Sequence, residues 1–226
     1  MSFTLSQVVP WGRDFEEYRG MFALSDEDLA TRILGCGDGP ASFNAEATKK
    51  GYNVVSVDPI YQFSGPEIDS WIKQVAPTIA EQTRSNSEEF IWSHFRSVDD
   101  LVAARMSAMS RFLVDYSLED SDARYVAASL PELPFPDKAF DLALCSHFLF
   151  LYSEHFDATF HVRSMIELAR TASEVRIFPL LELGSRQSRH LDAVVDAICS
   201  EGLAVARVRV PYEFQKGGNE MLRILG

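Results

Sequence analysis

The chain has 226 residues, of which 46% are hydrophobic and 24% charged, a composition typical of a folded domain and not of a disordered chain. Its formal net charge of −12 disfavours nucleic acid and anionic membranes as partners, because an acidic surface repels both. Three widely spaced cysteines (Cys36, Cys145 and Cys199) predict no metal site and fit a reducing, cytoplasmic setting. Neither a signal peptide nor a membrane span is expected.

The first part of the chain predicts a strand, a turn, a helix and a second strand behind a helical N-terminus. Residues 14–30 are expected to form one or two helical pieces. A short strand over 32–34 runs into the turn GCGDGP, and a helix over 41–50 and a β-branched strand over 52–58 follow. Together these elements predict a βαβ unit.

A long helical region is predicted over 66–116, where it interrupts the alternation of strands and helices. Its second half carries apolar residues at helical spacing, which are Val102, Met106, Met109, Leu113 and Tyr116. Such a stripe is typical of core packing, and it is also compatible with a lid over a pocket.

The α/β alternation resumes beyond residue 120. The expected strands are 124–129, 140–146, 174–181, 203–210 and 220–225, and the expected helices are 157–172 and 188–201. The last connection is too short for a crossover helix, so the final two strands must be antiparallel. We therefore predict a single α/β domain over 1–226. It has a doubly wound, mostly parallel sheet, a C-terminal antiparallel hairpin, a helical N-terminal cap (1–30) and a helical insertion or lid (66–116).

Two features of the βαβ unit suit a nucleoside ligand. The turn from Gly35 to Gly39 lets the backbone approach a ligand closely and places a helix N-terminus behind it. Asp58 ends the next strand, where a carboxylate can accept hydrogen bonds from both hydroxyls of a ribose. Alternatively, the glycines form only a tight connection, and Asp58 belongs to an Asp-Pro turn.

These motifs resemble those of a known enzyme family. ILGCGDGPASF followed by VVSVDP resembles the first two motifs of class I, Rossmann-like methyltransferases that depend on S-adenosylmethionine. LPELPFPDKAFDLALCSHFLFLY resembles their later motifs, and the terminal hairpin matches their antiparallel seventh strand. The resemblance implies S-adenosylmethionine as cofactor and methyl transfer as activity. Because the chain is acidic, we expect a small-molecule acceptor.

The resemblance also implies roles for individual residues. The turn would line the methionine end of the cofactor, Asp58 would hold the ribose, and Pro59 or Ile60 would pack on the adenine. Ser129 would contact the adenine amino group with Leu130 beside it, and Ser146 and His147 would face the sulfonium and the acceptor. The predicted cofactor-binding residues are Gly35, Cys36, Gly37, Asp38, Gly39, Asp58, Pro59, Ser129, Leu130 and Ser146.

Catalysis of methyl transfer needs alignment and exclusion of water more than covalent help. His147 is the candidate base or orienting group, since it follows a central strand at the edge where ligands bind; otherwise it is a packed histidine. An aromatic set beyond it lines an acceptor pocket or belongs to the core: Phe148, Phe150, Tyr152 and His155. In the N-terminal segment, Trp11, Arg13 and Tyr18 could close over the cofactor, with Arg13 paired to its carboxylate.

Two departures from the family pattern keep other functions open. Ile33 stands where the family often has an acidic residue, and Ser129 replaces a common aspartate. A non-catalytic protein that binds S-adenosylmethionine, or a scaffold of the same fold, is therefore the alternative. A nicotinamide-dependent oxidoreductase is a third possibility. Pro40 argues against it, because the dinucleotide fingerprint has Gly or Ala at that position.

Overall fold

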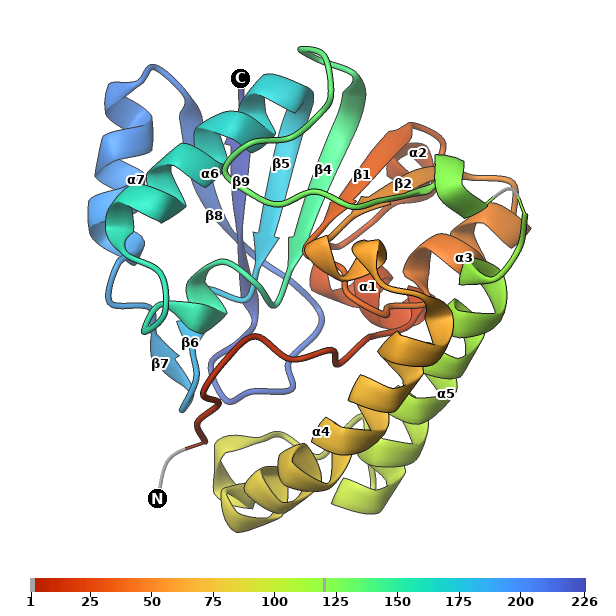
Figure 1. Ribbon diagram of the computed structural model, residues 1–226. Helices are drawn as coiled ribbons and strands as arrows, with labels where there is room; N and C mark the ends of the chain where they lie inside the picture. The colour runs from red at the N-terminus through yellow and green to blue at the C-terminus, as the bar shows by residue number, and fades with distance from the viewer. Residues whose placement is uncertain (1–2, 120) are drawn as a thin grey trace.

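A seven-stranded sheet forms the centre of the protein in the computed structural model, which describes residues 3–119 and 121–226 (Figure 1). Its strand order is β3-β2-β1-β4-β5-β9-β8. The first five strands are parallel, and β9 is antiparallel to both β5 and β8. The predicted fold class is thus confirmed. The strands are β1 (Arg32–Cys36), β2 (Asn53–Val57), β3 (Tyr125–Val126), β4 (Phe140–Ser146), β5 (Ala172–Phe178), β8 (Ala204–Arg209) and β9 (Glu220–Leu225).

Helices cover both faces of the sheet, so successive residues of the central strands enter different cores. In β1, Ile33 belongs to one apolar cluster and Leu34 to another. Helices α6 and α7 lie over the face of the second cluster, whereas α1 and α3 lie on the other side (Figure 1). This double coverage explains why the central strands are apolar almost throughout instead of alternating. The helices named here are α1 (Phe15–Met21), α3 (Phe43–Lys49), α6 (Ala158–Thr171) and α7 (Leu191–Ser200).

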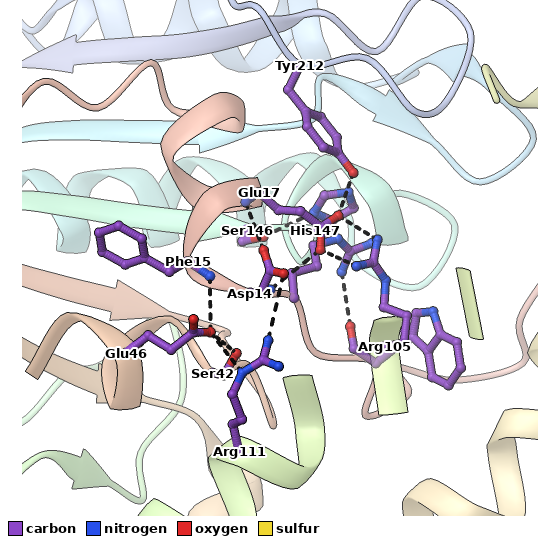
Figure 2. Close-up of polar contacts among 12 residues, drawn as sticks. Asp14, Phe15, Glu17, Ser42, Glu46, Arg105, Arg111, Ser146, His147 and Tyr212 are labelled. Atoms are coloured by element: carbon purple, nitrogen blue, oxygen red, sulfur yellow. Dashed lines mark hydrogen bonds and ion pairs between the residues drawn. The ribbon is translucent and has the colours of Figure 1, made fainter. Parts of the chain in front are cut away.

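The N-terminal helical region consists of two pieces, as the sequence predicts. Asp14 caps α1 and Ser25 caps α2 (Asp26–Leu29), and each helix has a capping box with an acidic residue at its third position. Glu46 of α3 ties this region down by accepting hydrogen bonds from the Phe15 backbone and the Ser42 hydroxyl (Figure 2).

The predicted helical insertion forms two long helices that pack side by side, α4 (Gly65–Ser85) and α5 (Val98–Tyr116) (Figure 1). Most of the predicted apolar stripe on α5 packs in a core between them: Met109 is buried there, and Met106, Leu113 and Tyr116 pack against the same cluster. The stripe therefore has the core-packing role. Short 3-10 helices occupy Pro59–Gln62, Ser87–Glu89, Ser121–Ala123 and Phe150–Tyr152.

Two strands are shorter than the sequence predicts. The strand expected over 124–129 pairs only at Tyr125–Val126, after which Ser129 forms an isolated bridge with Glu132. The strand expected over 174–181 ends at Phe178, because Pro179 has no backbone N–H to continue the ladder. Residues beyond it form a separate two-stranded sheet from β6 (Leu181–Glu182) and β7 (Arg186–Gln187).

Candidate functional site

A cavity of about 510 Å³ lies where β1, β2 and β4 end, at the carboxyl edge of the parallel strands. Open α/β sheets bind ligands at this edge, and the volume is in the range of small-molecule sites. Gly35 is a predicted cofactor residue that does not line the cavity, because it is buried one position before the end of β1. The predicted residues that line the cavity are Cys36, Gly37, Asp38, Gly39, Asp58, Pro59, Ser129, Leu130, Ser146 and His147.

The glycine turn is built for close packing. A Cβ on Gly35 would lie 1.9 Å from Oδ2 of Asp38, so Gly35 makes room for that carboxylate. Gly37 has a φ of +67°, and its Cβ would lie 2.8 Å from Cβ of Phe148. Both positions therefore require glycine, the first for space and the second for space and backbone conformation. At Gly37 and Gly39 the turn therefore presents backbone atoms, without side chains, to the cavity.

Asp38 belongs to this turn, and its side chain is buried. Its two oxygens accept hydrogen bonds from the Tyr18 hydroxyl and the Ser56 hydroxyl, each at 2.7 Å. Burial raises the pKa of the Asp38 carboxyl to about 6, although the two hydroxyls favour its charged form. Asp38 thus links the turn to α1 and β2, and it also lines the cavity.

Asp58 follows β2 and joins the glycine turn directly. Its Oδ2 accepts the backbone N–H of Gly39 at 2.9 Å, and its Oδ1 accepts the N–H of Ile60 at 2.8 Å. Burial raises its pKa to about 6, so the carboxyl is mostly ionised at pH 7. Each carboxylate oxygen has a further lone pair, which leaves Asp58 able to accept hydrogen bonds from two ligand hydroxyls.

The two departures from the family pattern have clear positions. Ile33 is fully buried in β1, within the apolar cluster on one face of the sheet, so this position offers no polar group to a ligand. Ser129 is exposed and lines the cavity next to Leu130. A hydroxyl is therefore present at the predicted adenine position.

His147 comes directly after β4 and has a left-handed backbone with a φ of 51°. Its backbone N–H donates to the carbonyl of Phe178 at 2.7 Å, and its Nδ1 lies 3.0 Å from Oγ of Ser146. Burial lowers the pKa of the imidazole well below its usual value, and the nearby Arg13 and Arg105 guanidinium groups lower it further. His147 is therefore a neutral imidazole at pH 7 and a weaker base than an exposed histidine.

Two arginines line the cavity, of which Arg105 is buried and paired, whereas Arg13 is partly buried. Both terminal nitrogens of Arg105 contact the carboxylate of Glu17, with Nη2 2.7 Å from Oε1, and the Tyr212 hydroxyl donates to the same carboxylate at 2.7 Å (Figure 2). Although burial lowers the pKa of Arg105, Glu17 and Tyr212 outweigh that effect and raise it. This ion cluster joins α1, α5 and the loop between β8 and β9.

Arg13 is the second arginine, and no carboxylate bonds it in the part of the chain that the structure describes. Its Nη1 donates to the carbonyl of Trp11 at 3.1 Å, whereas its Nε is buried without a partner. Burial and the neighbouring Arg105 lower the pKa of Arg13 to about 10, against the opposing effect of Glu17. It is a desolvated cation on the cavity wall, suited to a bidentate anion.

The N-terminal segment (residues 3–13) crosses the cavity and is fixed at separate points. The backbone N–H of Phe3 donates to Glu89 at 3.2 Å, that of Val9 donates to the Tyr152 hydroxyl at 3.3 Å, and the carbonyl of Arg13 accepts from Ser42 at 3.0 Å. Trp11 and Tyr18 also line the cavity. The predicted N-terminal cap therefore borders the site.

The aromatic residues after β4 are divided between pocket and core. Phe148 and Tyr152 line the cavity, as expected of acceptor-pocket residues. Phe150 is fully buried in the core instead, and His155 is exposed at the surface. For these two the pocket interpretation is wrong, because Phe150 packs in the apolar core of α6 and α7 and His155 lies at the surface beyond the 3-10 turn.

Sequence reasoning missed the ion cluster of Glu17, Arg105 and Tyr212. A signal for Arg105 exists in the helical pattern of α5, where it occupies a core position between Leu101 and Ala108. A charged residue at such a position must be paired or must serve a ligand. Its partners, however, come from distant parts of the chain and carry no local signal.

Comparison with known proteins gives a relative along almost the whole chain. Uncharacterized protein MJ0045 of Methanocaldococcus jannaschii is 35% identical over 222 residues, which is 97% of each chain. This chain belongs to the same family. The relationship covers the turn, the strand ends and the insertion alike. Because the relative is itself uncharacterized, the relationship assigns no activity. No model of a described protein family matches the sequence.

Solved structures with a similar fold include several methyltransferases. A TehB-like, S-adenosylmethionine-dependent methyltransferase from Corynebacterium glutamicum is 13% identical, with a TM-score of 0.48 and coverage of 93% of this chain and 86% of that one. Magnesium protoporphyrin IX methyltransferase from Synechocystis, solved with bound S-adenosylmethionine, is 11% identical, with a TM-score of 0.43 and coverage of 93% and 90%. The methyltransferase domain of bacterial CtHen1 is 11% identical, with a TM-score of 0.49 and coverage of 93% and 98%. At these identities and TM-scores the likenesses say nothing of activity.

Over residues 3–119 and 121–226, no helix is long and apolar enough to cross a membrane. Within the same ranges no group of three or more His, Cys, Asp or Glu side chains is arranged to hold a metal ion.

Proposed function

We propose that this protein binds S-adenosylmethionine and transfers its methyl group to a small-molecule acceptor. The observation that carries the proposal is the contact between the glycine turn and Asp58. The two elements are joined by the 2.9 Å hydrogen bond from Gly39 to Asp58, and both line one cavity at the carboxyl edge of the sheet. A bare backbone and a ribose-binding carboxylate side by side suit an adenosyl ligand.

The residues present fit this cofactor. Asp58 would hold the ribose hydroxyls, and Ser129 and Leu130 would border the adenine. The guanidinium of Arg13, which has no carboxylate partner among the described residues, would hold the cofactor's carboxylate, and this would give its buried Nε an acceptor. Because Ile33 offers no carboxylate, Asp38 is the remaining acidic group near the turn for the cofactor's amino group.

The cofactor, when bound, supplies an electrophilic methyl group on a positively charged sulfur. The protein has to align the acceptor and exclude water, for which the N-terminal segment across the cavity is suited. A base is useful only for an acceptor that is still protonated at working pH. His147, neutral and at the end of β4, would take that proton.

A non-catalytic protein that binds S-adenosylmethionine remains the second candidate, and the buried Ile33 favours it. Calorimetry with the cofactor followed by turnover assays on a broad panel of acceptors separates the two. Cofactor binding without turnover on any acceptor would support the non-catalytic role. Tight NADH binding without binding of S-adenosylmethionine would favour an oxidoreductase instead.

The direct test is calorimetry with S-adenosylhomocysteine on the wild type and on Asp58→Ala. The substitution removes the ribose acceptor, so we expect affinity to fall more than tenfold, or about 1.4 kcal/mol. Asp122→Ala, at an exposed position away from the cavity, is the control and should leave affinity unchanged. If folded Asp58→Ala binds as tightly as the wild type, or if the wild type does not bind, the proposal is wrong.

A further inference from the structure

The same cavity is also lined, away from the glycine turn and Asp58, by a set of apolar residues, and we call this part the outer chamber. Its walls come from the N-terminal segment, the end of α4, the connection between α4 and α5, the start of α5 and the loop before β9: Phe3, Ile79, Phe90, Leu101 and Phe214. Phe90 stacks on Phe214 with ring centroids 4.8 Å apart, and Phe3 meets Phe90 edge-on at 6.0 Å. These walls come from elements outside the predicted nucleoside-binding unit.

The outer chamber has little polarity. Thr83 lies in its wall, but its hydroxyl donates to the carbonyl of Ile79 at 2.8 Å within α4. Gln215 is also uncharged, and its backbone pairs with Phe90 in an isolated bridge. The chamber therefore offers a ligand mainly apolar side chains.

Each charged side chain on the wall of the cavity is either bonded within the protein or assigned to the cofactor. Within the described residues these are Arg13, Asp38, Asp58 and Arg105. Glu17 neutralises Arg105, and hydroxyl and backbone donors hold the two aspartates. Arg13 remains for the cofactor's carboxylate in the proposed function. In the proposed function the cofactor's amino group and ribose take Asp38 and Asp58, so among the described lining residues no charged side chain is left to balance a charged acceptor, and burying an unpaired ion is costly.

We infer that the acceptor is an uncharged, largely apolar molecule whose body fills the outer chamber and whose one polar nucleophile, a hydroxyl or amine, faces His147. This inference rests on the proposed function, because it takes Arg13 and the crevice as the cofactor's share of the cavity. A neutral hydroxyl or amine must lose a proton when it is methylated, and the neutral imidazole of His147 can take that proton. An anionic acceptor would have no proton to lose.

The transfer balances with these groups. A lone pair on the acceptor's oxygen or nitrogen forms the bond to the methyl carbon, and the carbon–sulfur bond breaks with its electron pair left on sulfur. The acceptor's proton passes to the imidazole of His147. The positive charge lost by the sulfur is then carried by the protonated imidazole of His147. Loss of the proton to bulk water restores the neutral histidine.

A pair of fluorescent probes tests the polarity of the chamber without knowledge of the acceptor. N-phenyl-1-naphthylamine is neutral, and 8-anilinonaphthalene-1-sulfonate has the same rings with an added anionic sulfonate. Each is titrated into the protein saturated with S-adenosylhomocysteine. We expect the neutral probe to bind at least tenfold more tightly. Equal binding, or tighter binding of the sulfonate, would overturn the inference, as would no binding of the neutral probe.

A variant locates the probe. Leu101→Asp places a carboxylate in the chamber wall and should weaken binding of the neutral probe at least tenfold. The matched control on the same helix is Val114→Asp, at a position that is 62% exposed and outside the cavity, and it should have no effect. If Leu101→Asp does not fold, Phe3→Asp replaces it, because Phe3 lies in the N-terminal segment outside the sheet. Unchanged probe binding in the folded variant would refute the location.

Binding of S-adenosylhomocysteine is measured separately by calorimetry, so the two hypotheses fail in different ways. Loss of the preference for the neutral probe, with S-adenosylhomocysteine still bound, contradicts only the inferred acceptor. Absence of product binding contradicts the proposed function, and a preference for the neutral probe would then still report an apolar chamber.

Discussion

The two arginines of the cavity wall differ in their partners, and an experiment can measure the difference. Arg105 is buried and paired with Glu17, whereas Arg13 is partly buried and, among the described residues, donates only to the carbonyl of Trp11. Burial of the guanidinium and the neighbouring Arg105, opposed by Glu17, lower the pKa of Arg13 from 12.5 to about 10. Arg13 is charged at pH 7 in both the folded and the unfolded chain, so the cost of burial is fully present there. At about 1.4 kcal/mol per pKa unit it amounts to about 3 kcal/mol of lost stability.

We therefore expect Arg13→Met to stabilise the ligand-free protein. Methionine keeps the apolar volume and removes the charge, but it loses the bond from Nη1 to the Trp11 carbonyl, worth about 1 kcal/mol. The net gain is about 2 kcal/mol, or a rise in Tm of about 4–8 °C for a chain of this size. At the same time affinity for S-adenosylhomocysteine should fall about 30-fold or more, since a buried charge pair with the ligand's carboxylate is lost.

Thermal unfolding without ligand and calorimetry with ligand measure the two effects on one variant. Arg105→Met is the matched control, and it should lower stability by about 3–5 kcal/mol because it leaves Glu17 buried without its partner. A lower Tm for Arg13→Met, with ligand affinity unchanged, would show that Arg13 stabilises the fold and would refute its role as a carboxylate ligand.

Three further substitutions test other parts of the site. Gly37→Ala should destabilise the protein by about 1–3 kcal/mol in urea unfolding, because it strains a left-handed position and meets Phe148; unchanged stability would show that the turn adapts. His147→Asn tolerates the left-handed backbone, so cofactor affinity should stay within about threefold while turnover on an acceptor falls about 100-fold; full turnover would make His147 structural. Asp38→Asn should raise stability at pH 7 by up to about 3 kcal/mol, because burial raises the pKa of Asp38 to about 6. As the pH falls, Asp38 of the folded wild type becomes protonated and its burial no longer costs stability, so the stability advantage of Asp38→Asn should shrink below pH 6 and vanish below about pH 4. An advantage that does not depend on pH would contradict burial of the charge as the cause.

The parts of the fold that local signals specify were predictable. The turn between Gly35 and Gly39 and the strand ending at Asp58 lie close in the sequence, so their spacing predicts the βαβ unit and places both at one cavity. The short link between β8 and β9 likewise leaves only an antiparallel pair. Chain connectivity and turn chemistry are sufficient for these features.

Features that depend on tertiary contacts were not predictable in the same way. The strand predicted over 124–129 has the right composition, but only two of its residues lie beside β2. Phe150 and Tyr152 belong to one aromatic run, yet the local 3-10 turn sends the first into the core and the second to the cavity. Which aromatic residue meets the ligand is decided by backbone direction, which residue type does not encode.

The ion cluster around Glu17 also has a consequence for how the chain assembles. The hydroxyl of Tyr212 reaches Glu17 from 195 positions away, and Arg105 reaches it from 88. During synthesis on the ribosome, α1 is made before its partners. The carboxylate of Glu17 can be fully bonded only after Arg105 of α5 and Tyr212 of the loop between β8 and β9 have also been made. Contacts between such distant segments slow folding, since much chain must be ordered first. The ion cluster on the cavity wall therefore cannot be complete until Tyr212 has been synthesised.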